Sequence, residues 1–169
     1  MKHRIIMAIA CVLAVCMLGG CGAAANETKE PVTDGFSCTA QITYGEMELT
    51  ARLRRTAAEA FTVAFESPKS LNGVTVGLSG TDMTLELGGM KVAVPTERVP
   101  QRALILCLAR VLEATHPTGQ RTEDGYVIEG EAEGESYTLV CDPDSGLPRS
   151  LSVPSQELTV TFTDVTMNL

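Results

Sequence analysis

The sequence predicts a mainly β protein of the α+β class, with about ten antiparallel strands and one helix. Three observations lead to this prediction. From Gly35 onward, apolar and polar residues alternate with a period of two, as in strands that bury one face. Short turn signals separate the runs, and connections of that length join antiparallel neighbours. Residues 101–115 carry apolar residues at helical spacing instead.

Six strands are expected before the helix. Residues 36–44 and 47–54 form the first alternating pair, on either side of the Gly45-Glu46 turn. Four shorter runs follow, separated by turns that contain Gly or Pro. The residues on their inward face are Phe61, Val63 and Phe65, then Val74, Val76 and Leu78, then Met83, Leu85 and Leu87, and finally Met90, Val92 and Val94.

The helix is expected over residues 101–115. Pro95 and Pro100 end the sheet, and a proline is tolerated in the first helical turn because its missing N–H would have no partner there. His116-Pro117 is expected to end the helix. The apolar stripe at helical spacing consists of Leu104, Cys107, Leu108, Val111 and Leu112.

Four strands are expected after the helix, with a turn over residues 142–146. Their inward residues are Tyr126 and Ile128, then Tyr137, Leu139 and Cys141, then Leu147, Leu151 and Val153, and last Leu158, Val160 and Phe162. The alternating acidic residues Glu129, Glu131, Glu133 and Glu135 are interpreted as a solvated face. Arg54-Arg55 is interpreted in the same way, as a pair of charges that face solvent at a strand end.

The first 20 residues have the pattern of a signal peptide. Residues 1–4 are positively charged, and residues 5–18 form an apolar run shorter than the roughly 20 residues of a membrane-spanning helix. An ordinary secretory signal cleaved near Ala23-Ala24-Ala25 is one alternative, and an uncleaved anchor is another.

Leu18-Gly19-Gly20-Cys21 has the form of a lipobox, which predicts cleavage before Cys21 and a diacylglyceryl thioether on its sulfur. Two or more acyl chains give stable membrane anchoring, whereas one chain is marginal. The predicted organisation is a signal peptide over residues 1–20, a lipidated Cys21 and flexible tether over 21–34, and one domain over 35–169. The predicted location is the extracytoplasmic face of the cell membrane.

Composition narrows the classes of function. The net charge is −8 for the whole chain and becomes more negative when Lys2 and Arg4 leave with the signal, which argues against a nucleic-acid partner. Cys38, Cys107 and Cys141 cannot all pair with one another and lack metal-ligand spacing, so buried small hydrophobic residues are expected. No serine-nucleophile motif is present, and His116 is assigned to the helix end or the surface. No enzymatic activity, cofactor or metal is expected.

A meander of ten strands that is apolar on one face must bury that face against another structural element. A helix of roughly 15 residues is about 22 Å long and covers only a few strands. The sheet must therefore curl strongly around the helix or leave an apolar concavity. Aliphatic and Met side chains would line that concavity and suit acyl chains.

Several stretches resemble the bacterial lipoprotein-carrier superfamily, which includes LolA, LolB and LppX-like proteins. They are residues 65–68 with 71–73, residues 89–95, and residues 137–142 with 145–148. The resemblance implies an open half-barrel of antiparallel strands with its helix on the concave face, and a role in carrying lipids or lipoproteins. The superfamily usually has a helix before the first strand, whereas the tether of this chain is too polar to predict one.

The expected function is non-enzymatic binding of a hydrophobic ligand, either a lipid or the acyl chain of a lipoprotein. An envelope interaction or stress-sensing module with a packed core and a protein partner is the alternative. A third hypothesis is a β-sandwich adhesion-like module, with the helix packed outside both sheets. The predicted lining of the ligand site consists of Phe65, Val76, Met83, Leu85, Leu104, Leu108 and Val111.

Overall fold

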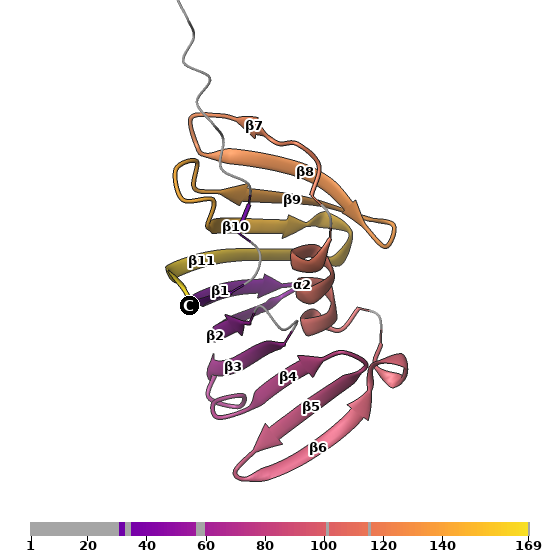
Figure 1. The fold of residues 1–169 in the computed structure, drawn as a ribbon. Coiled ribbons are helices and arrows are strands. Elements are labelled where there is room, and N and C mark those ends of the chain that lie inside the picture. Colours follow the sequence, from indigo (N-terminus) through magenta and orange to yellow (C-terminus); the bar gives the residue numbers. More distant parts are fainter. Residues whose placement is uncertain (1–30, 33–34, 57–59, 101, 115, 169) are drawn as a thin grey trace, which may run out of the picture.

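The computed structural model describes residues 31–32, 35–56, 60–100, 102–114 and 116–168. Within these ranges the chain forms one 11-stranded sheet, with the helix α2 against one face (Figure 1). The mainly β prediction is confirmed, and the strand beyond the predicted ten is the two-residue β7. The predicted signal peptide, the lipobox and Cys21 lie outside the described residues. No helix in the described ranges is long and apolar enough to cross a membrane.

The sheet is antiparallel throughout, in the order β6-β5-β4-β3-β2-β1-β11-β10-β9-β8-β7. The elements are β1 (Phe36–Tyr44), β2 (Met47–Arg55), β3 (Phe61–Ser67), β4 (Thr75–Ser79), β5 (Asp82–Leu87), β6 (Met90–Pro95), η1 (Thr96–Arg98), α2 (Leu104–Glu113), β7 (Gln120–Arg121), β8 (Tyr126–Ala132), β9 (Glu135–Cys141), β10 (Pro148–Val153), η2 (Pro154–Gln156) and β11 (Leu158–Met167). The first and last strands pair in the middle of the sheet, from Phe36 opposite Met167 to Tyr44 opposite Leu158.

The alternation in the sequence appears directly as burial. In β1, Phe36, Cys38, Ala40 and Ile42 are all at most 4% exposed, while polar residues between them face outward. The turn between β5 and β6 is made by Gly88 and Gly89, both with positive φ, which matches the twist of a two-residue hairpin.

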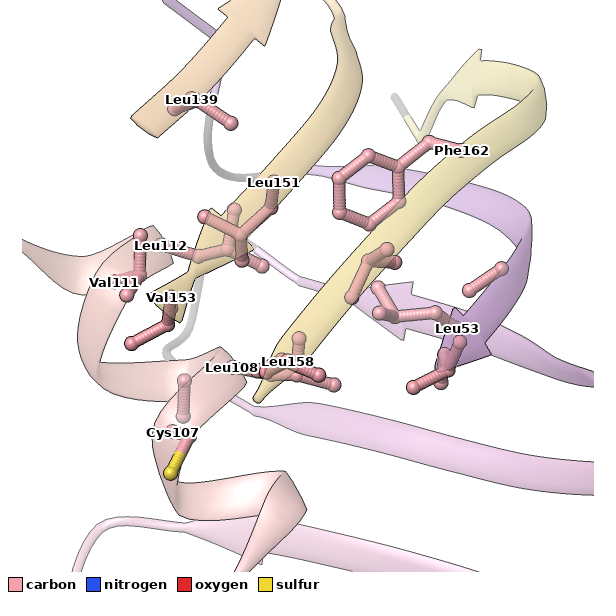
Figure 2. Close-up of a cluster of buried hydrophobic side chains, with 14 of the residues drawn as sticks. Leu53, Cys107, Leu108, Val111, Leu112, Leu139, Leu151, Val153, Leu158 and Phe162 are labelled. Atoms are coloured by element: carbon pink, nitrogen blue, oxygen red, sulfur yellow. The ribbon is translucent and has the colours of Figure 1, made fainter. Parts of the chain in front are cut away.

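Helix α2 is shorter than predicted and more completely buried. Its described span is Leu104–Glu113 because the preceding segment forms tighter turns, in which Val99 N–H donates to Thr96 and Ala103 N–H to Pro100. In addition to the predicted stripe, the core includes Ile105, Leu106 and Ala109. Figure 2 shows Leu108 and Leu112 of α2 lying toward the labelled leucines of β10 and β11. The helix therefore fills the middle of the sheet's concave face.

The three described cysteines are buried thiols, as expected for small hydrophobic residues. Burial raises the pKa of Cys38 and of Cys141 to about 12, and it also raises the pKa of Cys107. These thiols therefore stay protonated at neutral pH and contribute through packing.

Candidate functional site

One half of the sheet carries an apolar strip that extends beyond the helix. Directly opposite residues in antiparallel strands lie on the same side of the sheet. Val76 in β4, Leu85 in β5 and Val92 in β6 are directly opposite one another, and they continue the row of Val63 in β3. Leu87 and Met90 form the next pair outward, beside the β5–β6 turn. We call Val76, Met83, Leu85, Leu87, Met90 and Val92 the wing face.

Exposure rises along this row from the core to the sheet edge. Val63 is 1% exposed and Val76 is half-buried, whereas Leu85 is 44% and Val92 55% exposed. At the tip of the hairpin, Met90 reaches 71%. Contiguous exposed apolar surface on a soluble domain marks an interaction site. The wing face is therefore the candidate site for a hydrophobic ligand.

The structure brings together four of the seven predicted lining residues on this side of the sheet. Val76 and Met83 belong to the wing face and pack against the core, and Phe65 packs against the core from the neighbouring β3. Leu85 lies on the wing face, farther out and more exposed.

The three predicted lining residues from the helix occupy different places. Leu104 is half-buried beside the core, and Leu108 is completely buried within it. Val111 lines a separate cleft on the opposite half of the sheet. Leu87, Met90 and Val92 are not among the predicted lining residues, although the alternation places them on the inward face. These residues lie on the strands farthest from the single helix, so they could have been predicted to stay uncovered and to belong to the lining.

The cleft that Val111 lines lies between α2 and the end of β8, and we call it the α2–β8 cleft. It has a volume of 210 Å³. Its apolar wall consists of Cys107, Val111, Ala132 and Val153. Its charged residues are Arg102, Arg110, Glu133 and Glu135. Arg110 and Glu133 form an ion pair at 2.8 Å between Nε and Oε2.

Glu135 differs from the other members of the acidic row. Glu129, Glu131 and Glu133 are exposed, as expected, but Glu135 is half-buried. Gln156 Nε2 donates to its Oε1 at 2.8 Å, and the Ser155 hydroxyl donates to Oε2. The hydrogen bond from Ser155 is the main cause that lowers the pKa of Glu135. The interpretation of the whole row as a solvated face is therefore wrong at its last member.

A polar cluster at the end of α2 corrects the interpretation of Arg55 and places His116 at the helix end, one of its two expected positions. Arg55 does not face solvent but is 7% exposed, because the inward side of β2 continues to its last residue. Its Nη1 donates to the carbonyl of Leu112, where a cation also complements the helix dipole. His116 is partly buried rather than on the surface, and its Nδ1 lies 2.7 Å from the hydroxyl of Tyr137. Within the described part of the chain, no cluster of three or more His, Cys, Asp or Glu residues could hold a metal ion.

His116 is expected to make folding stability depend on pH. Burial, and secondarily the nearby charge of Arg55, lowers its pKa below 6.5 in the folded state. As the pH falls through 6.5, the unfolded chain takes up a proton that the folded chain does not, so the free energy of unfolding decreases. Urea denaturation of the wild type and of His116→Gln at several pH values measures this effect. Parallel pH profiles for the two proteins would contradict it.

One open antiparallel sheet with a helix across its concave face is the architecture of an open half-barrel. No protein-family model and no curated protein matches the sequence. Among solved structures, an uncharacterized conserved protein from Thermus thermophilus is 19% identical, with a TM-score of 0.51 over 82% of each chain. At this identity the similarity establishes a shared fold alone.

Two further solved structures are similar at lower scores. A LolA superfamily protein from Nitrosomonas europaea is 12% identical, with a TM-score of 0.43 over 85% of this chain and 90% of that one. A domain assigned as an outer membrane lipoprotein-sorting protein, from Vibrio parahaemolyticus, is 7% identical, with a TM-score of 0.40 over 86% and 90%.

Proposed function

We propose that this chain is a non-enzymatic, lipid-anchored protein of the extracytoplasmic membrane face that binds an acyl chain of a lipid or lipoprotein on its wing face. The observation that carries the proposal is the continuous apolar row from Val63 to Val92. This row is buried at one end and 55% exposed at the other. A ligand that lies on β4, β5 and β6 would therefore contact an apolar surface that is continuous with the core.

The dimensions of the wing face suit part of an acyl chain. Three adjacent strands present a surface about 10 Å wide, and the interval from Met83 to Leu87 along β5 adds about 13 Å in the other direction. Each methylene removed from water contributes about 0.8 kcal/mol. Five methylenes on this surface would therefore contribute about 4 kcal/mol, roughly a thousandfold in affinity.

An aspartate on the wing face is expected to abolish ligand retention. The variant Val92→Asp places a carboxylate in the apolar row, and contact with an acyl chain would then require desolvation of that charge. The matched control is Ala93→Asp, because residue 93 is exposed on the same strand and its side chain points to the opposite face. Mass spectrometry of organic extracts from the purified proteins measures the bound lipid. We expect at least a tenfold lower lipid content for Val92→Asp and no change for Ala93→Asp. Equal lipid content in both variants, or a lipid-free wild type, would refute the proposal.

The proposed anchor is tested at Cys21. Val32 N–H donates to the carbonyl of Gly146 at 2.8 Å, so the chain enters the domain beside the β9–β10 turn. From there a fully extended segment back to Cys21 spans at most about 40 Å, enough to hold the domain near a membrane. The variant Cys21→Ser lacks the thiol that the thioether requires. We expect it to lose metabolic labelling with palmitate and to leave the membrane fraction or retain its signal peptide. A Cys21→Ser protein that remains membrane-bound at the mature mass would contradict the anchor.

A further inference from the structure

The α2–β8 cleft lies in the half of the sheet that the proposed acyl site does not use. Residues of α2 form one wall, and the ends of β8, β9 and β10 with η2 form the other. The wing face is built from β4, β5 and β6 beyond the opposite flank of the central strands. The two sites share none of their residues, so each can be tested without the other.

The charged groups around this cleft differ in whether they have hydrogen-bond or ion-pair partners. Glu133 accepts from Arg110, and Glu135 accepts from Ser155 and Gln156, so both carboxylates already have donors. Among the described residues the guanidinium of Arg102 makes no hydrogen bond or ion pair, and its positive charge contributes to lowering the pKa of Glu135. The Tyr44 hydroxyl donates to the backbone carbonyl of Arg102, which holds this part of the chain at the cleft.

The wall behind these charges is apolar and small. Cys107, Val111, Ala132 and Val153 are each at most 9% exposed and form a floor without a charged group. A volume of 210 Å³ is the liquid volume of about seven water molecules. It is also below the roughly 300 Å³ at which pockets for drug-sized molecules begin. The cleft therefore suits a ligand, or part of a ligand, of about seven to eight non-hydrogen atoms.

We propose that the α2–β8 cleft binds a carboxylate or phosphate on a short apolar stem, with the anion on Arg102 and the stem against Val111, Ala132 and Val153. A guanidinium pairs with either anion through two parallel hydrogen bonds, and these charge-assisted bonds are stronger than neutral ones. Both a free short-chain acid and the head of a membrane lipid present this chemistry.

Titration with three small probes tests the proposal on the whole chain. Hexanoate carries both features, acetate lacks the stem, and hexylammonium carries the stem with the opposite charge. Methyl NMR signals of Val111 and Val153 report the cleft, and those of Val92 report the wing face. We expect saturable shifts of the cleft signals with hexanoate, and at least tenfold weaker binding of the other two probes at the cleft. Any shift of the Val92 signals with hexanoate or hexylammonium reports separate binding of the apolar stem to the wing face. Equal binding of acetate or of hexylammonium would overturn the proposal.

Two variants connect the binding to the named residues. Arg102→Ala is expected to weaken hexanoate binding about tenfold, the effect of a charge-assisted hydrogen bond. Arg54→Ala, which removes an exposed arginine from the outer face of β2, should leave it unchanged. Equal affinities of these two variants would overturn the proposal. Ala132→Trp should block the cleft in a protein whose circular dichroism is unaltered, and if this variant does not fold, the arginine pair still decides the question.

A competition experiment distinguishes the two sources of the ligand, and a wing-face variant distinguishes the two proposed sites. Dihexanoyl phosphatidylglycerol that displaces hexanoate from the cleft supports a lipid head as the ligand, and failure to displace it supports a free acid. Val92→Asp should bind hexanoate as the wild type does. Failure of the acyl-chain proposal would therefore leave this result intact, and the reverse also holds.

Discussion

Replacing Leu108 by alanine is expected to lower the free energy of unfolding by about 2–5 kcal/mol. Leu108 is completely buried in α2, and Figure 2 shows it among the leucines and valines of β10 and β11. Truncation removes methyl groups from the centre of the core and leaves a cavity that the surrounding strands can fill only partly. The loss is a large fraction of the 5–15 kcal/mol that stabilises a typical domain.

The matched variant is Leu104→Ala, one turn earlier on the same side of α2. Leu104 is only half-buried, so its truncation should cost about 1 kcal/mol. Urea denaturation with a common m-value gives both losses. Similar losses at the two positions would show that Leu108 is not the central contact between the helix and the sheet.

Replacing Gly130 by alanine is expected to destabilise the domain by about 1–3 kcal/mol, through overpacking. Gly130 in β8 lies directly opposite Tyr137 in β9, and the aromatic ring covers the glycine. A Cβ at this position would lie 2.5 Å from Cζ and 2.9 Å from Cε1 of Tyr137. The ring would have to move, and the hydrogen bond between its hydroxyl and His116 would be lost with it.

Gly77→Ala is the control for this effect. Gly77 also lies within a strand, but its added Cβ would meet only the hydroxyl of Thr84, which can rotate away. Thermal denaturation should therefore show a clearly larger decrease in Tm for Gly130→Ala than for Gly77→Ala. Chemical shifts of the Tyr137 ring report whether it has moved. An unchanged ring signal in Gly130→Ala would contradict the proposed overlap.

The strands could be predicted because burial of one face imposes a period of two on each of them. The alternation from Phe36 to Ile42 in the sequence is the alternation in exposure. Two-residue β7 could not be found in this way, since so short a strand has no period. The order of the strands was also beyond this signal, because hairpin-length connections identify sequential neighbours and carry no information on the pairing of β1 with β11.

The apolar character of the candidate site could be predicted from the sequence, but its position on the sheet only in part. The mismatch between one helix and a long sheet correctly implied uncovered apolar residues, and Leu85 is one of them. The side on which α2 lies decides which residues stay uncovered, and helical periodicity does not specify that side. Arg55 was assigned to solvent from its charge, although its position on the inward side of β2 predicts burial once the helix end is present to accept its hydrogen bond.

The seam between β1 and β11 has a consequence for the order in which the molecule can form. Ser37 and Thr166 meet there although 129 residues separate them in sequence. During synthesis from the amino end, β1 is complete long before its neighbour β11 exists, so one long side of β1 stays open until the last segment is made. The two meanders, β1–β6 and β8–β11, can each pair locally and early. Their union must be late, and loss of the final strand would leave two separate sheets in place of one.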